Sequence, residues 1–306
     1  MLARTLRLLI ALEIVVYATI ALRGFDASPL GAALGVAFGV LAIRALIVAV
    51  TYAYAWVFHS PAPRLSVPQA LRMAFAEYAA FIAVFVLILP GEPLWMGADR
   101  LRPERDRLPL LLIHGYGCSR GVWWWLRRRL EAAGWTVATI SLEPVYTSID
   151  DYVEPLARRI DALLAETRSA QLILVAHSMG GLVARAYLQR CGAVRVARLV
   201  TLGTPHAGSE LARIGIGRNA RQMEPGSTWL RTLARTKAMP ETVAIYSPHD
   251  NYVMPQVNLE LPGATNTALG GLGHLSMLFS PRVAHVLLAA LEKRNAPSAG
   301  WKLRSV

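Results

Sequence analysis

One short segment limits the possible folds of this chain more than any other. It reads Leu172-Ile173-Leu174-Val175-Ala176-His177-Ser178-Met179-Gly180-Gly181. An apolar run typical of a buried strand leads directly into Ser178, and a helical pattern begins at the next residue. A serine at so sharp a turn needs tiny residues two positions to either side, because larger ones collide with the adjoining backbone, and Ala176 and Gly180 meet this need. The segment therefore predicts a strand, a tight turn and a helix in immediate succession.

Short apolar runs alternate with helical patterns through the rest of residues 109–295. We expect strands at Leu110–Ile113, Thr136–Leu142, Leu172–Ala176, Arg198–Leu202 and Thr242–Tyr246. Helices are expected at Val122–Ala133, Ile149–Thr167, Met179–Cys191 and Pro281–Lys293. Strands that alternate with helices form a mostly parallel sheet covered on both faces. In such an α/β sheet the functional side chains gather at the carboxyl ends of the strands.

The turn at Ser178 has the pattern of a nucleophile elbow, usually Gly-x-Ser-x-Gly, with alanine in the first place here. A serine that only caps a helix is the alternative, but such a cap requires neither a strand before it nor two glycines after it. Three further motifs are His114-Gly115-Tyr116-Gly117, Gly203-Thr204-Pro205-His206-Ala207-Gly208-Ser209 and Gly273-His274-Leu275. With these motifs the chain resembles the α/β-hydrolase family, and more narrowly its bacterial lipases and esterases, over roughly residues 108–294. The resemblance implies an α/β-hydrolase fold and cleavage of carboxylic esters.

A serine nucleophile needs a base, and the base needs an acid that fixes its tautomer. His274, in a glycine-flanked loop, is the expected base, and the resemblance also implies it because the family order is serine, acid, histidine. His206 and His249 stay open as alternative bases. Asp250 is the expected acid because it follows the carboxyl end of a strand, and Glu260 is the alternative.

An oxyanion hole needs two backbone amides aimed at the developing charge. The amide of Met179, directly after Ser178, is one, and the resemblance implies the amide of Tyr116 as the other. Residues expected to support the elbow and its neighbouring loop are His114, Gly115, Gly117, Ala176, His177 and Gly180. We expect His114 to hold that loop and to take no part in the chemistry.

Residues 208–240 contain no clear strand and mix apolar residues, among them Leu211 and Ile214, with arginines. The resemblance implies a cap over the site here. The mixture suits a lid that meets an anionic lipid surface, or equally an ordinary cap with a solvated basic face. Three successive tryptophans, which begin at Trp123, cannot all face a core, so we expect at least one partly exposed ring and hypothesise that they form a wall for an acyl chain.

We expect no metal and no cofactor. Calcium-containing bacterial lipases carry a carboxylate shortly after the catalytic histidine, whereas His274 is followed by Leu275-Ser276-Met277-Leu278-Phe279. The net charge of +12 does not indicate nucleic acid, because the arginines are scattered and no nucleic-acid-binding signature accompanies them. A solvated face or attraction to anionic lipid explains the charge better, and the oligomeric state is not predicted.

The N-terminal third differs in composition from the rest. It holds ten charged residues up to Trp95, and its apolar stretches are Leu8–Leu22, Leu30–Phe58 and Met73–Leu89. About 20 helical residues cross a bilayer core of ~30 Å, so we predict three membrane helices, with a cleaved signal peptide as the alternative for the first. Each stretch is interrupted by one charge, namely Glu13, Arg44 and Glu77. Since a charge in lipid is costly, we expect these three to face one another or a cavity, most simply as a structural ion pair.

Arginines in the short loops predict the orientation. Arg4 and Arg7 precede the first stretch and Arg64 and Arg72 lie in the second loop, while the first loop has Arg23 balanced by Asp26. The positive-inside rule then places the N-terminus and the second loop in the cytoplasm. Three crossings put the catalytic domain outside the cytoplasm. The alternative is two crossings with the first stretch lying on the membrane surface, which would put the domain inside.

The domain plan that follows is a membrane module over residues 1–90, a linker over 91–108, a hydrolase domain over 109–295 with its cap at 208–240, and a tail over 296–306. We expect a multi-pass serine hydrolase of the plasma (inner) membrane that cleaves lipid-like carboxylic esters through an acyl-enzyme on Ser178. Acyl transfer to an alcohol by the same triad is an alternative. A membrane-attached binding module that has lost catalysis is another.

Overall fold

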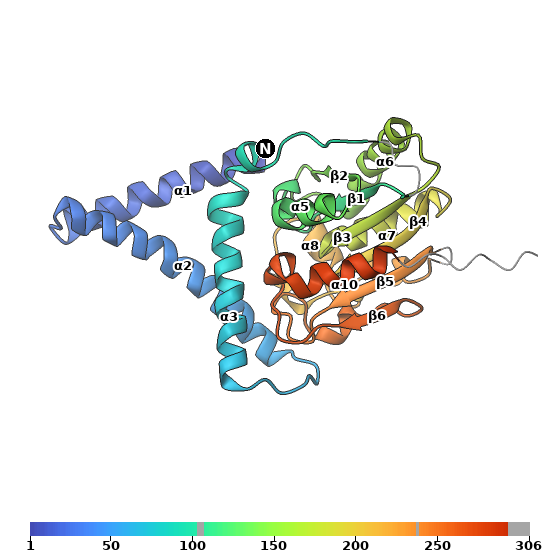
Figure 1. Ribbon diagram of the computed structural model, residues 1–306. Helices are drawn as coiled ribbons and strands as arrows, with labels where there is room; N and C mark the ends of the chain where they lie inside the picture. The colour runs from blue at the N-terminus through green and yellow to red at the C-terminus, as the bar shows by residue number, and fades with distance from the viewer. Residues whose placement is uncertain (103–106, 237–238, 293–306) are drawn as a thin grey trace, which may run out of the picture.

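Six parallel strands form the sheet at the centre of the hydrolase domain in this computed structural model, which describes residues 1–102, 107–236 and 239–292 (Figure 1). The strands are β1 (Leu110–Ile113), β2 (Val137–Ile140), β3 (Leu172–His177), β4 (Val196–Leu202), β5 (Glu241–Tyr246) and β6 (Thr265–Ala268). Their order is β2-β1-β3-β4-β5-β6. The first five confirm the predicted strands to within a few residues. The sixth was missed because this edge strand, Thr-Asn-Thr-Ala, has no apolar run.

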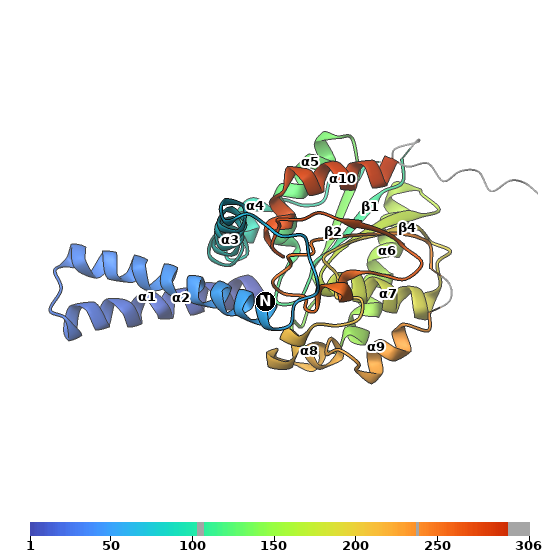
Figure 2. The same ribbon diagram turned by 90° about the horizontal axis from the view of Figure 1, so that it is seen from below.

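Helices cover both faces of the sheet, as predicted. Figure 2 shows α5 (Trp124–Ala132) and α10 (Pro281–Glu292) on one face, and α6 (Val153–Thr167) and α7 (Met179–Cys191) on the other. Alternate residues of β1 divide between the two cores: Leu111 and Ile113 pack toward α6 and α7, and Leu110 and Leu112 toward α5 and α10. Every residue of β1 and β3 is buried, which explains their unbroken apolar sequence.

The described part of residues 208–240 contains three short helical segments: a 3-10 turn (Glu210–Ile214), α8 (Arg218–Gln222) and α9 (Thr228–Leu233). One polar contact ties this segment to the loop after β1. The Tyr116 hydroxyl donates to the carbonyl oxygen of Ile216 over 2.7 Å and accepts from its amide over 2.9 Å. The side chains of Ile214 and Ile216 are exposed, so the segment presents an apolar edge.

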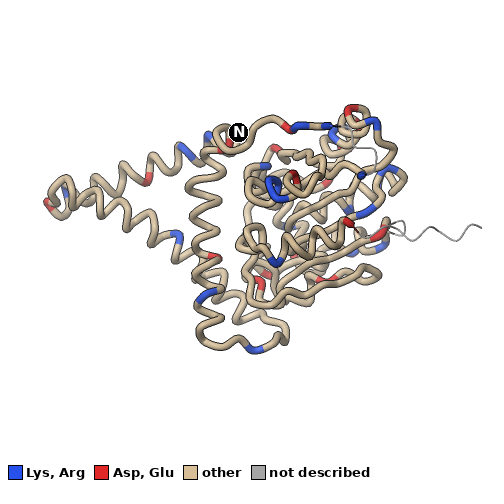
Figure 3. Tube along the Cα trace, viewed as in Figure 1, with Lys and Arg blue, Asp and Glu red and all other residues tan. Residues whose placement is uncertain are grey.

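Three long apolar helices precede the hydrolase domain. They are α1 (Leu2–Thr19, continued by a π-helical turn to Gly24), α2 (Pro29–Val57) and α3 (Val67–Ile82, continued likewise to Ile88). Each is long and apolar enough to cross a membrane. Figures 1 and 2 show α1 and α2 as a hairpin that projects away from the hydrolase domain, while α3 lies along it. Charges are sparse on all three helices (Figure 3).

The charged residues inside these helices follow two different arrangements. Arg44 of α2 pairs with Glu13 of α1 at 2.6 Å, which confirms the expected structural ion pair. Glu77 of α3 does not join them. It is completely buried against the hydrolase domain.

The segment between α3 and β1 packs tightly where it is described. After the short α4 (Glu92–Trp95), the carboxylate of Asp99 pairs with Arg120, Arg127 and Arg159 at 3.3, 3.0 and 2.7 Å. The predicted linker is thus fixed to the hydrolase domain through Asp99. The predicted tail, 296–306, lies outside the described residues.

Candidate active site

Ser178 lies at the carboxyl end of β3, between that strand and α7. Its backbone angles, φ 55° and ψ −131°, fall in a region that side-chain-bearing residues rarely adopt, and the surrounding contacts hold it there. Its amide donates to the carbonyl oxygen of Leu202 over 2.9 Å. A Cβ on Gly180 would lie 2.5 Å from the carbonyl oxygen of Ile113, so the small-residue requirement predicted for the elbow is a real steric limit. The Ser178 side chain is half-buried.

Asp250 and His274 form a buried pair at the same edge of the sheet. Asp250 follows β5 and His274 follows β6, and these two strands are parallel neighbours. Ser178 follows β3, which is separated from β5 by β4 alone. The distance from His274 Nδ1 to Asp250 Oδ2 is 2.7 Å. The other carboxylate oxygen accepts from the amides of Tyr252 and Val253 at 2.7 and 2.9 Å. These donors hold the carboxylate in place and aim it at the imidazole.

The environment of His274 favours a proton on its ring. Burial opposes the charge, but the carboxylate and hydrogen bond of Asp250, with a contribution from Glu77, raise the pKa of His274 above its ordinary value. The ring stacks on Tyr252 at a centroid separation of 4.9 Å and lies 4.7 Å from the ring of His177, next to Ser178. Among the described residues no hydrogen bond joins the Ser178 hydroxyl to His274, and such contacts often tighten only when substrate binds.

The alternative bases are engaged elsewhere. His206 is buried, contacts Thr201 Oγ1 at 3.1 Å and lies beside Arg185, and burial lowers its pKa well below the ordinary value. Both ring nitrogens of His249 have partners: Nδ1 accepts from the amide of Gly271 at 3.1 Å, and Nε2 contacts the carbonyl oxygen of Pro63 at 2.8 Å. Neither histidine pairs with a carboxylate in the part of the chain that the structure describes.

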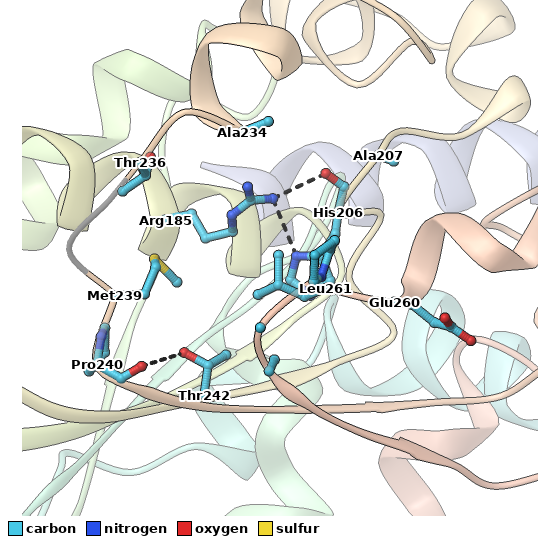
Figure 4. A pocket seen from close by; sticks show the side chains of 13 residues that line it. Arg185, His206, Ala207, Ala234, Thr236, Met239, Pro240, Thr242, Glu260 and Leu261 are labelled. Carbon is cyan, nitrogen blue, oxygen red and sulfur yellow. Dashed lines mark hydrogen bonds between the residues drawn. The ribbon is translucent and has the colours of Figure 1, made fainter.

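The alternative acid, Glu260, is exposed and accepts a 2.6 Å hydrogen bond from the Tyr246 hydroxyl. It borders a cavity of 440 Å³, whose other lining residues include Arg185, His206, Met239 and Leu261 (Figure 4). Ser178, Asp250 and His274 do not line this cavity. We therefore assign it no part in the chemistry at Ser178.

The two predicted oxyanion donors belong to segments that adjoin Ser178, namely the start of α7 and the loop after β1. Neither the amide of Met179 nor that of Tyr116 donates a hydrogen bond within the described residues. A Cβ on Gly115 would lie 2.7 Å from that of Ser178, so the loop after β1 runs directly beside the serine. Gly117 has φ 64°, a conformation that favours glycine.

His114 and His177 support the backbone around these donors. His114 Nε2 accepts from the amide of Leu142 at 2.8 Å, and burial lowers the pKa of His114 to about 4, so its ring is neutral. His177 Nε2 lies 3.2 Å from the carbonyl oxygen of His274. Ala176 is buried beneath the turn.

The proposed acyl-chain wall is only partly consistent with the structure. Trp123 is completely buried and contacts His177 edge-on, so it supports the site from the core and offers no open surface. Trp124 and Trp125 are half-buried, as expected for at least one of the three. In the cap, Leu211 is half-buried and Ile214 is exposed.

The sequence missed the residues that hold the acid and base loops. The Asn251 side chain donates to Thr51 Oγ1 of α2 at 2.7 Å and accepts from the His274 amide at 3.0 Å. Glu77 of α3 contacts the loop of His274. The one signal for Glu77 was its charge inside an apolar stretch, and Asn251 was marked only by its place after Asp250.

Comparisons with known proteins agree with this geometry. Residues 109–225 match the family model described as the alpha/beta hydrolase fold. A triacylglycerol lipase of Burkholderia plantarii is 30% identical over 160 residues, which are 47% of this chain and 44% of the relative. Methylesterase 17 of Arabidopsis thaliana is 33% identical over 99 residues, 29% of this chain and 35% of the relative. The chain thus spans less than half the length of these two relatives.

Solved structures show the same fold at low identity. Aspergillus fumigatus lipase B has a TM-score of 0.59 at 18% identity, covering 94% of this chain and 81% of its own. The mature form of a Bacillus licheniformis lipase has a TM-score of 0.56 at 20% identity, covering 64% of this chain and 96% of its own. The elbow, the parallel sheet and these matches show that the described part of the domain has the α/β-hydrolase fold, and that the chain is similar to lipases and esterases.

Proposed function

We propose that this protein is a serine hydrolase that cleaves carboxylic esters through a triad of Ser178, His274 and Asp250. The observation that carries the proposal is the buried pair of His274 and Asp250, 2.7 Å apart, at the sheet edge where Ser178 occupies a strained turn. Buried ionisable pairs and strained backbone are costly, and they persist mainly where function requires them.

In the proposed reaction, Ser178 Oγ attacks the ester carbonyl carbon and His274 Nε2 accepts the hydroxyl proton. Asp250 holds the Nδ1 proton and stabilises the imidazolium that forms. The amides of Tyr116 and Met179 donate to the oxyanion. His274 then gives the proton to the departing alcohol, which leaves an acyl-enzyme on Ser178, and water attacks this ester by the same steps in reverse order.

Lipid-like esters are the proposed substrates. The relatives include triacylglycerol lipases, and α1 and α2 expose apolar side chains suited to a bilayer. We place the enzyme in the plasma (inner) membrane as a multi-pass protein. A crossing by α3 would put the catalytic domain outside the cytoplasm, whereas two crossings would put it inside.

Labelling with a fluorophosphonate, which reacts with activated serines, tests the triad. The full chain in detergent is compared with Ser178→Ala and His274→Ala, with folding checked by circular dichroism. We expect labelling of the wild type and none of either variant, followed by hydrolysis of p-nitrophenyl esters that also depends on Ser178. A folded wild type that stays unlabelled, and that cleaves no ester in the presence of lipid, would overturn the proposal.

A further inference from the structure

Glu77 reaches from α3 to the loop that carries His274. The side chain is completely buried. Its two carboxylate oxygens accept from the amide of Leu275 at 2.9 and 3.1 Å, and one also accepts from the amide of Ser276 at 2.8 Å. On the other side of His274, a Cβ on Gly273 would collide with the same carboxylate. The carboxylate therefore fixes the backbone both before and after His274.

The negative charge of Glu77 has no cationic side-chain partner among the described residues. The titratable groups that face it are Tyr52 of α2, Tyr252 and His274, of which only His274 gains positive charge in the proposed reaction. Burial opposes a charge on Glu77, whereas the two amides and a protonated His274 favour it. The carboxylate is therefore stabilised most when His274 carries positive charge.

We propose that Glu77 is a positioning residue for His274: it holds the loop and adds a second negative charge that stabilises the imidazolium. This inference rests on the proposed serine-hydrolase function. It also makes α3 a part of the catalytic domain, because the loop lacks any other carboxylate to receive these amides among the described residues.

The test uses the full chain in detergent and the variant Glu77→Gln, which keeps the shape and removes the charge. We expect kcat for a soluble short-chain ester to fall at least tenfold with little change in KM, and the acid limb of kcat/KM to move to lower pH, because the imidazolium loses a stabilising charge. Glu77→Asp should recover part of the loss. The control is Tyr78→Phe, which removes only a 3.0 Å hydrogen bond to Leu41 of α2 and should leave both quantities unchanged.

An unchanged acid limb in Glu77→Gln would overturn the proposal, whatever happens to kcat. Hydrogen exchange gives a readout that does not need activity: the peptide spanning residues 273–278 should exchange faster in Glu77→Gln than in Tyr78→Phe. A wild type without Ser178-dependent hydrolysis would overturn the proposed function. Equal hydrogen exchange of residues 273–278 in Glu77→Gln and Tyr78→Phe would separately overturn the role of Glu77 in holding the loop.

A second inference concerns the bilayer, and it rests on other contacts. Both ends of the α1–α2 hairpin touch the hydrolase domain. At one end, the N-terminal amine pairs with Glu143 at 2.8 Å. At the other, the amide of Ser60 donates to Gln256 at 2.8 Å, and the Ser60 hydroxyl accepts from the amide of Val257 at 2.9 Å. The hairpin therefore leaves the domain and returns to it.

The third apolar helix lies along that same domain. At 1.5 Å per residue, the span Val67–Ile88 is about 33 Å long, close to the thickness of a bilayer core. Phe81, Val84 and Ile88 are buried, while Val67 and Phe75 are exposed. If this helix crossed the bilayer, the domain packed along it would have to enter the hydrocarbon, which its charged surface forbids.

We infer that only α1 and α2 cross the membrane, that the exposed apolar side of α3 rests on the bilayer surface, and that the catalytic domain is cytoplasmic. Four arginines, Arg4, Arg7, Arg64 and Arg72, lie at the domain end of the hairpin. At its tip Arg23 is offset by Asp26, so the positive-inside rule assigns the domain end to the cytoplasm. The inference replaces the predicted outside location. It agrees with the two-crossing alternative on a cytoplasmic domain, but it assigns the surface position to α3 and not to the first stretch.

Cysteine labelling in a bacterial expression host tests the sidedness. Cys191 is exposed on the hydrolase domain and Cys118 is buried. A membrane-impermeant maleimide should label the wild type in inverted vesicles and not in intact spheroplasts. Phe25→Cys combined with Cys191→Ser places the reactive thiol at the hairpin tip and should give the reverse pattern. Labelling of Cys191 in intact spheroplasts, or of both positions from one side, would overturn the inference.

Discussion

The replacement Asp250→Asn is the most direct test of how the site is held together. Asp250 is completely buried, and its carboxylate lies 2.7 Å from His274 Nδ1. The substitution keeps the shape and the acceptor oxygen for the amides of Tyr252 and Val253. It removes the charge that stabilises the imidazolium, and it introduces an amide group that favours the wrong imidazole tautomer.

The expected loss can be worked from the geometry. Charges centred about 4 Å apart at an effective dielectric constant of about 20 attract by about 4 kcal/mol. Each ~1.4 kcal/mol corresponds to a factor of ten, so kcat/KM should fall about 10³-fold from the charge alone, with the tautomer change adding to this. The pKa of His274 should fall as well, because Asp250 raises it in the wild type. Activity requires the neutral ring, so the acid limb of kcat/KM should move to lower pH.

Hydrolysis of a short-chain p-nitrophenyl ester by the full chain in detergent, measured across pH, provides the assay. The matched control is Glu260→Gln, which removes the alternative acid and its bond to the Tyr246 hydroxyl and should retain wild-type kcat/KM. A loss of less than tenfold in Asp250→Asn would refute the reasoning. So would a larger loss in Glu260→Gln.

Three further outcomes are expected. Gly115→Ala should lower kcat/KM about 100-fold, because the new Cβ would lie 2.7 Å from that of Ser178. Gly97→Ala has open space around the new Cβ and should keep wild-type kcat/KM, so equal activities of the two variants would contradict this steric argument. Asp99→Asn should lower the free energy of unfolding by about 3 to 5 kcal/mol, because three arginines lose their shared carboxylate partner. The Tm should fall, and an unchanged Tm would show that these ion pairs are not needed for stability. Tyr116→Phe removes both hydrogen bonds to Ile216 and should speed hydrogen exchange across residues 210–222, and equal exchange would show that the cap is held by other contacts.

The parts of the site that sequence predicted are those with local causes. The elbow follows from steric limits within ten residues, and the structure shows the limit directly at Gly180, where a Cβ would meet the carbonyl of Ile113. The strands that could be located carry unbroken apolar runs because both faces are covered. The edge strand β6 is mostly exposed and has a polar sequence, so no local pattern marked it. Without β6, the prediction of His274 depended on its glycine-flanked loop and on the resemblance.

The role of Glu77 depends on contacts that no local pattern contains. An acid inside an apolar stretch predicts an intramembrane partner, and for Glu13 that partner is Arg44. For Glu77 the partners are backbone amides 198 and 199 residues away, which every sequence possesses and which therefore carry no signal. Thr51 also had no local signal, because its side-chain contact with Asn251 spans 200 residues. The sequence therefore shows that Glu77 is a charge in need of a partner, but it does not show which backbone amides supply that partner.

The two halves of the site consequently depend on different parts of the chain. The proposed nucleophile and oxyanion donors are fixed by β1, β3 and α7, all within the sheet and its helices. The acid and base loops are fixed by Thr51 and Glu77 from the apolar helices. Without those helices, the amides of Leu275 and Ser276 would lose their acceptor, and an unsatisfied buried amide costs about 1 to 3 kcal/mol. The apolar helices therefore support the geometry of His274 and Asp250, and the proposed catalytic unit extends beyond residues 109–225, which the family model matches.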